Sequence, residues 1–125
     1  MRVLVSGLPK IPDLGFPEIG KSTGFGGFTC NSIRNFTHTC LSLATWTDQT
    51  QYSNKVAFVA DRNQVLRNVV DEVLLLYPHL QVVFDDKIFE KKIIAKDLAA
   101  ECFHPNAKAQ ETLSLTLWPV QPWFH

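Results

Sequence analysis

The sequence has little cysteine, no excess charge of either sign and no long hydrophobic run. Three cysteines in 125 residues are too few for a disulfide scaffold, and no Cys-x-x-Cys pair indicates a zinc site. Twelve basic residues balance twelve acidic ones, which disfavours nucleic acid and anionic membranes as partners. The longest apolar run, Val73 to Tyr77, covers about a quarter of the roughly 20 residues of a membrane-spanning helix. We therefore expect no nucleic acid, no stable membrane insertion, no metal and no cofactor.

The rest of the composition is that of an ordinary globular domain. Hydrophobic residues make up 46% of the chain and charged residues 19%. The apolar stretch within residues 1–5 ends at Ser-Gly-Leu-Pro and is too short for a signal peptide. No export signal is recognised, and the location of the protein stays open. We expect a single domain over residues 1–125.

Two short apolar runs and the helical pattern between them predict a parallel β-α-β unit. Residues 2–7 and 80–84 are rich in β-branched side chains and end at turn residues, as strands do. From Asn54 to just before Pro78, apolar residues recur every three or four positions, which predicts an amphipathic helix. A helix that connects two strands favours parallel pairing. The expected fold class is therefore α/β.

The remaining segments give weaker patterns. Residues 8–29, rich in proline and glycine, are expected to form a long loop, and residues 30–48 one helix. Residues 86–98 suit a short helix or an irregular turn. His104-Pro105-Asn106 opens a helical pattern that Pro119 ends, and residues 120–125 are expected to form a surface tail. Three aromatic residues are expected to pack the last helix against the sheet: Trp118, Trp123 and Phe124.

The glycine-rich segment contains two letter patterns known from enzymes. Gly15 to Ser22 fits the nucleotide-binding formula G-x-x-x-x-G-K-S, and Asp85 after a strand could hold magnesium. Gly20 to Gly24 fits the nucleophile elbow G-x-S-x-G. Both motifs need a strand directly before the loop and a helix directly after it, and the prolines and glycines disfavour both. A flexible glycine-rich loop is the competing interpretation.

Glu101 and His104 are the candidate catalytic residues. An acid three residues before a histidine, on a turn that opens a helix, can bind Nδ1 and leave Nε2 free to accept a proton from a hydroxyl. These are two of the three members of a serine-hydrolase relay. An exposed histidine at a helix start, without catalytic function, is the structural alternative.

Three blocks of sequence resemble a known family. They are Val-Leu-Val-Ser-Gly-Leu-Pro-Lys-Ile at 3–11, Glu-Ile-Gly-Lys at 18–21, and Glu-Cys-Phe-His-Pro-Asn-Ala-Lys-Ala-Gln at 101–110, followed by Leu-Trp. Together they look like the C-terminal half of SGNH (GDSL-type) hydrolases, particularly the phospholipase-B-like lipases. The last of the three blocks is the most specific.

This resemblance implies the C-terminal portion of a flavodoxin-like α/β/α sandwich with a parallel sheet. It implies an ester hydrolase for small-molecule or lipid esters, from a family whose members are often secreted. His104 would be the general base and Glu101 its orienting acid, one methylene longer than the usual aspartate. The Gly-Asp-Ser motif and the oxyanion residues do not occur in the chain. We therefore expect the domain to lack its N-terminal half, with a missing N-terminal segment as a partner, and this chain alone to be inactive.

A non-catalytic module derived from that family is the second hypothesis, with the glycine-rich loop as its contact to a partner. Cys30 and Cys40 could form a disulfide, as related secreted lipases would allow, or remain buried thiols. Cys102 beside His104 is a weaker candidate nucleophile. Four lysines are expected to form a solvated helix face: Lys87, Lys91, Lys92 and Lys96. Three histidines suggest no metal site: His38, His79 and His125.

Overall fold

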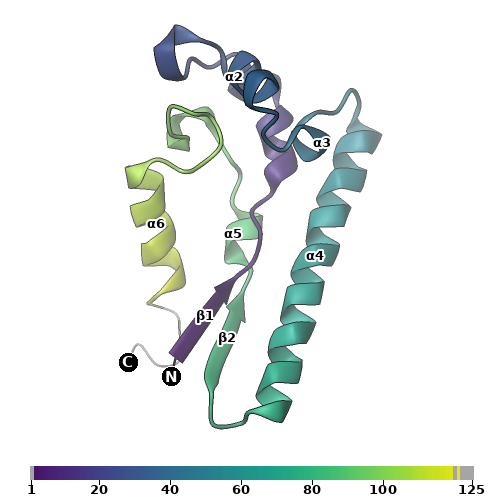
Figure 1. Ribbon diagram of the computed structural model, residues 1–125, viewed down its shortest axis with the longest axis vertical. Helices are drawn as coiled ribbons and strands as arrows, with labels where there is room; N and C mark the ends of the chain where they lie inside the picture. Colours follow the sequence, from purple (N-terminus) through teal and green to yellow (C-terminus); the bar gives the residue numbers. More distant parts are fainter. Residues whose placement is uncertain (1, 120, 122–125) are drawn as a thin grey trace.

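The computed structural model describes residues 2–119 and 121, and it has a mixed α/β fold with a two-stranded parallel sheet (Figure 1). This confirms the predicted α/β class. Among the described residues, no helix is both long and apolar enough to cross a membrane. The elements in chain order, with η for a 3-10 helix, are β1 (Arg2–Ser6), η1 (Ile11–Gly15), α1 (Pro17–Gly20), η2 (Phe25–Gly27), α2 (Cys30–Thr37), α3 (Leu41–Ala44), α4 (Gln49–Leu76), β2 (Gln81–Asp85), α5 (Lys87–Glu90), η3 (Ala95–Asp97) and α6 (Ala107–Leu117).

β1 and β2 form the predicted parallel pair. Arg2 lies opposite Gln81 and Ser6 opposite Asp85, and α4 makes the connection between the strands. In Figure 1, α4 and α6 lie on opposite sides of the strand pair. Within the described part of the chain each strand has one neighbour, so each keeps an open edge.

The connecting helix α4 begins five residues before the predicted start at Asn54. Asp48 caps it, since its carboxylate accepts a hydrogen bond of 2.9 Å from the Gln51 N–H. The predicted start is wrong because the apolar periodicity begins later than the cap, and the first turn of the helix is polar. The predicted end, just before Pro78, is confirmed.

A buried asparagine joins α4 to the end of β1. Asn63 is 4% exposed, and its Oδ1 accepts a hydrogen bond of 2.6 Å from the Leu8 N–H. Its Nδ2 donates to the Leu8 carbonyl at 3.0 Å. The amide is thus satisfied on both sides, and it fixes where the chain leaves the strand.

The segment predicted as a long loop, residues 8–29, contains η1, α1 and η2. Proline stands in the first turn of both η1 and α1, where its missing N–H costs nothing. The prolines therefore begin short helices here. Leu14 and Ile19 from this segment pack with Ala44 as the buried apolar core.

A buried carboxylate holds η1 in place. Asp13 is 1% exposed, and it accepts hydrogen bonds from the Tyr52 hydroxyl at 2.9 Å and from the Ile93 N–H at 3.2 Å. Burial, together with the hydrogen bond to Asp13 and its charge, raises the pKa of Tyr52 to about 12. The phenol therefore remains a proton donor at neutral pH and links α4 to η1.

The helix predicted over residues 30–48 is split in two. Thr29 caps α2, and His38 and Cys40 then adopt left-handed backbone conformations with φ of 55° and 49°. A continuous helix cannot pass through such residues. The chain therefore turns between α2 and α3.

The C-terminal helix α6 begins after Asn106, whose side chain accepts a hydrogen bond of 3.0 Å from the Ala109 N–H. Trp118, expected from the sequence to pack the last helix against the sheet, is 47% exposed, so about half of its surface is open to solvent. The expected surface tail is wrong at Gln121, which is 2% exposed and donates a 3.1 Å hydrogen bond to the buried Asp85 carboxylate. Trp123, Phe124 and the rest of the tail lie outside the described residues.

Candidate active site

The expected pairing of Glu101 with His104 is present. Glu101 Oε1 lies 2.9 Å from His104 Nδ1 and also accepts a 2.7 Å hydrogen bond from the His104 backbone N–H. Since an ionised carboxylate only accepts hydrogen bonds, the proton in this contact belongs to Nδ1, and in the neutral ring Nε2 then presents the lone pair. Nε2 has no hydrogen-bond partner among residues 2–119 and 121, and the imidazole is 70% exposed. The ring is therefore held from one side and open on the other.

The environment of Glu101 keeps its carboxylate ionised. Partial burial raises the pKa of Glu101, but the backbone and side-chain hydrogen bonds with His104 and the histidine charge outweigh this. The net result is a Glu101 pKa below its ordinary value. A carboxylate in this state at neutral pH can stabilise the imidazolium that forms when Nε2 accepts a proton.

A disulfide and a backbone hydrogen bond hold the turn that carries this pair. Cys102, 1% exposed, is bonded to Cys30 at the start of α2, and the Phe25 N–H donates to the Ala100 carbonyl at 2.7 Å. The possible Cys30–Cys40 disulfide is not formed, because Cys30 is bonded to Cys102 instead. Cys40 lies in the turn after α2 and remains a free thiol. The idea of Cys102 as a nucleophile is wrong as well, since its sulfur is in the disulfide.

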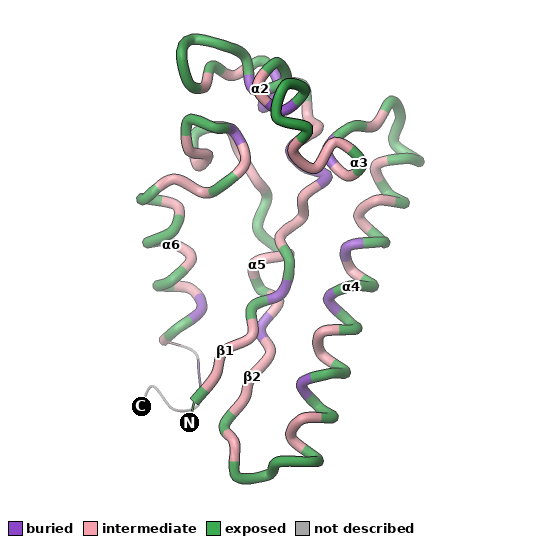
Figure 2. The backbone as a smooth tube through the Cα atoms, in the orientation of Figure 1, coloured by how far each residue is buried: buried purple, intermediate pink, exposed green. Residues whose placement is uncertain are grey.

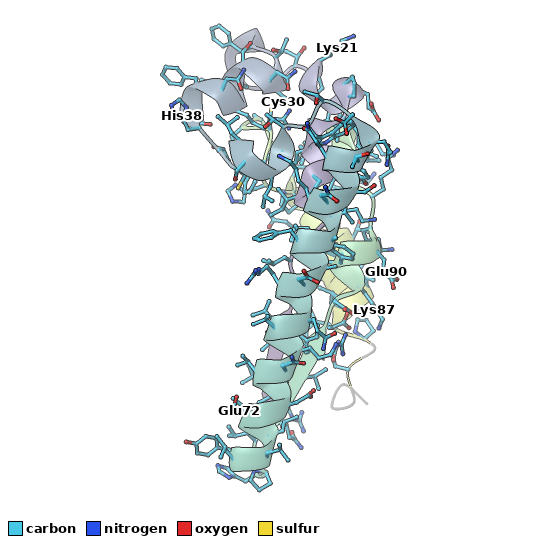
Figure 3. All side chains as sticks on the ribbon, turned by 90° about the vertical axis from the view of Figure 1, so that its right-hand side faces the viewer. Lys21, Cys30, His38, Glu72, Lys87 and Glu90 are labelled. Atoms are coloured by element: carbon cyan, nitrogen blue, oxygen red, sulfur yellow. A yellow bond between two sulfur atoms is a disulfide. The ribbon has the colours of Figure 1, made fainter. Side chains whose placement is uncertain are left out.

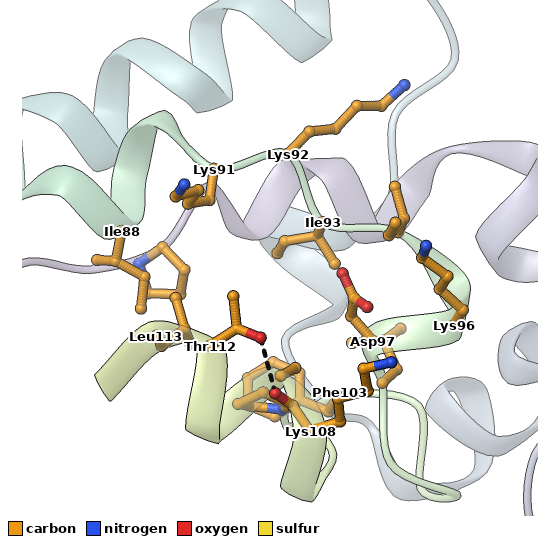
Figure 4. Close-up of a pocket in the computed structure, with 15 residues that line it drawn as sticks. Ile88, Lys91, Lys92, Ile93, Lys96, Asp97, Phe103, Lys108, Thr112 and Leu113 are labelled. Atoms are coloured by element: carbon orange, nitrogen blue, oxygen red, sulfur yellow. Dashed lines mark hydrogen bonds between the residues drawn. The ribbon is translucent and has the colours of Figure 1, made fainter. Parts of the chain in front are cut away.

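An apolar pocket of about 550 Å³ adjoins the turn. It lies between α6 and the chain from α5 to η3, and its lining includes Ile88, Ile93, Leu98, Phe103 and Leu113 (Figure 4). These side chains come from separate segments, so no local sequence pattern predicts the pocket. Phe103, one residue before the histidine, also packs edge-on against its ring at 5.0 Å between centroids.

Four lysines contribute to the pocket lining: Lys91, Lys92, Lys96 and Lys108. The first three are exposed, as predicted, but the predicted common helix is wrong, because Lys91 and Lys92 follow the end of α5 and Lys96 belongs to η3. Lys87 differs, since it belongs to α5 and lies 3.5 Å from the Asp85 carboxylate. Lys92 extends away from the other labelled side chains in Figure 4, and its Nζ lies 5.3 Å from the centre of the Phe16 ring.

Neither letter pattern of the glycine-rich segment forms its enzyme site. A phosphate cradle needs free backbone N–H groups, but those of Ile19, Gly20, Lys21 and Ser22 all donate to backbone carbonyls in and around α1. Ser22 is also no nucleophile elbow, because its hydroxyl donates to the Ile19 carbonyl at 2.6 Å and no strand leads into it. The described residues contain no cluster of histidine, cysteine and acidic side chains that could hold a metal.

No protein-family model, no curated protein and no solved structure matches this chain. The function must therefore be inferred from the site itself.

Replacing Glu101 with glutamine should remove a small, pH-dependent part of the stability. Because the folded-state pKa of Glu101 is lowered, its contribution is present above the unfolded-state pKa and is lost as the pH falls through the folded-state value. Both side chains are largely exposed, so we expect a loss of only a few tenths of a kcal/mol at pH 7. Urea unfolding across the acidic range measures it.

Glu111→Gln is the matched control, because the Glu111 side chain is exposed and takes part in no ion pair among the described residues. It should leave the stability unchanged at every pH. A Glu101→Gln effect that persists or grows in acid would contradict the assigned direction of the shift.

Proposed function

We propose that this chain supplies the proton-transfer half of an ester hydrolase. His104 is the general base, and Glu101 is the residue that positions it. The observation that carries this proposal is the carboxylate bound to Nδ1 of an imidazole whose Nε2 meets no partner in the described part of the chain, next to an apolar pocket. A histidine that served only to begin a helix would need neither feature.

The relay works through one nitrogen. Nε2 takes the proton of a serine hydroxyl while the serine oxygen attacks the ester carbonyl. The imidazolium then gives this proton to the departing alkoxide, and a water molecule repeats the two transfers to release the acid. Glu101 stays ionised throughout and stabilises the positive ring at a distance of 2.9 Å.

The serine belongs, in this proposal, to a segment outside the 125 residues. The chain has no Gly-Asp-Ser motif, and both strands of its sheet have an open edge in the described region. A preceding segment that added strands there would complete a flavodoxin-like α/β/α sandwich of the SGNH type. It would also bring the nucleophile and the oxyanion donors to His104.

The pocket indicates the kind of ester. Its apolar lining suits an acyl chain, and Phe103 and Pro105, which flank the histidine, both contribute to that lining. Esters of aliphatic acids, lipid esters among them, are therefore the proposed substrates.

Covalent labelling tests this function. The polypeptide from the longest reading frame that contains this chain should react with a fluorophosphonate at one serine, whereas these 125 residues alone should not. His104→Ala should slow the labelling by about a hundredfold or more, because the general base is lost. His79→Ala, another exposed histidine, is the control and should label normally. Equal labelling of the His104→Ala variant would refute the proposal.

A non-catalytic interaction module remains the second candidate, because of one specific observation. Phe25 and Phe28, on the turn at η2, are 76% and 63% exposed. Exposed aromatic side chains of this kind are common in protein interfaces. If the longer polypeptide has no reactive serine, this candidate is favoured over the hydrolase.

A further inference from the structure

One side of α4 carries an uncovered stripe of six residues. In Figure 3, α4 lies in front of the rest of the molecule, and Figure 2 shows much of its length exposed. The six residues recur at alternating intervals of four and three, and all are exposed; they are Phe58, Arg62, Val65, Val69, Glu72 and Leu76. We call them the α4 seam. Alternation of this kind is the pattern by which two helices pack in a coiled coil.

The seam is distinct from the side of α4 that packs on the sheet. The buried residues of the helix are Val59, Asn63 and Val70, and none belongs to the seam. The apolar members of the seam are nevertheless large, and Phe58, Val65 and Val69 are each about half exposed. From Phe58 to Leu76 the seam is about 27 Å long, given a rise of 1.5 Å per residue.

The seam is symmetric about its midpoint. The midpoint is at the level of Arg67. Phe58 and Leu76 lie nine residues from it on either side. Arg62 and Glu72 lie five residues from it, and Val65 and Val69 lie two residues from it. When two such helices run antiparallel about a two-fold axis at that level, each residue meets its counterpart. Apolar residues then meet apolar ones, and arginine meets glutamate.

The two charged members of the seam are available for this contact. Neither Arg62 nor Glu72 takes part in an ion pair among the described residues. The guanidinium of Arg62 lies 4.7 Å from the centre of the Phe58 ring, so the side chain runs along the seam. A parallel arrangement would place arginine against arginine and glutamate against glutamate, so the charges favour the antiparallel one.

We propose that the α4 seam binds a second copy of this chain, as an antiparallel helix pair with two Arg62–Glu72 ion pairs between the copies. The seam is complementary to itself in its apolar and its charged positions, which is what an isologous dimer requires. The ion pairs fix the register and the direction of the helices. This inference does not depend on the hydrolase function, because neither Glu101 nor His104 belongs to the seam.

Sedimentation and charge exchange test the dimer. The wild-type chain should sediment at about twice 14.1 kDa as its concentration rises. In the Arg62→Glu dimer glutamate would face glutamate at both 62–72 contacts, and in the Glu72→Arg dimer arginine would face arginine. Each substitution should therefore raise the dissociation constant of the dimer by about a hundredfold or more. The double exchange restores opposite charges and should restore the dimer.

Mixing the two single variants gives the sharpest result. Their seams are complementary, with two glutamates facing two arginines, so the mixture should form a heterodimer although each variant alone is monomeric. Asp71→Arg, next to the seam, is the matched control and should dimerise like the wild type. The proposal is overturned if the wild-type chain remains at 14.1 kDa, if the single variants still dimerise, or if the mixture does not pair.

Discussion

Replacing Cys30 and Cys102 with alanine should destabilise the protein by about 4 kcal/mol, the value that the chain-entropy relation gives for a crosslink spanning 72 residues. Such a loss is a large fraction of the stability of a domain of this size. Both cysteines are buried, and their bond ties the start of α2 to the turn that carries the candidate relay. Urea unfolding of the variant and of the wild type measures the difference.

The reduced wild-type protein should behave like the double variant, since both lack the same bond. Cys40→Ala is the matched control, because Cys40 is a free and partly exposed thiol, and it should change the stability much less. Equal unfolding midpoints with and without reductant would contradict the Cys30–Cys102 pairing.

Replacing Gly24 with alanine should cost roughly 1–3 kcal/mol, the range found for an overfilled site. A Cβ at this position would lie 2.6 Å from both Cys102 Sγ and Ile33 Cδ1, and it would also meet the Ala100 carbonyl. The glycine-rich turn would have to move away, and the hydrogen bond from the Phe25 N–H to Ala100 would weaken. Thermal unfolding reports the cost.

Gly27→Ala provides the comparison for this substitution. A Cβ at Gly27 meets nothing within 4 Å, but its φ of +81° is unfavourable for alanine and should cost about 1 kcal/mol. Crowding at Gly24 should therefore cost more than backbone strain at Gly27. If Gly24→Ala left the stability unchanged, this would contradict the close packing of Gly24 against Ala100 and Cys102.

Features that depend on neighbouring residues could be predicted from the sequence. The two strands and the helix between them follow from local periodicity, and their parallel pairing follows from the connection. The Glu101–His104 contact could also be predicted, because a spacing of three residues within a turn places the Glu101 carboxylate beside His104 Nδ1. The start of α4 could not be predicted from periodicity, because Asp48 caps a turn that has no apolar pattern.

Features that depend on distant residues could not be predicted in this way. Cys30 is nearer to Cys40 in the sequence, but the left-handed residues after α2 direct Cys40 away and the fold brings Cys102 to Cys30. Gln121 is buried because the Asp85 carboxylate, at the end of β2, accepts a hydrogen bond from it. The pocket likewise combines Pro9, the segment after α5 and α6, which no local pattern connects.

The most direct test of the relay is the protonation state of the His104 ring, measured by nitrogen NMR at neutral pH. In the neutral ring we expect the proton on Nδ1 and a lone pair on Nε2, and we expect Glu101→Ala, which removes the acceptor, to abolish this preference while His79 keeps its own signals. A proton on Nε2, unchanged when Glu101 is replaced, would show that the carboxylate does not orient the ring and would contradict the proposed function.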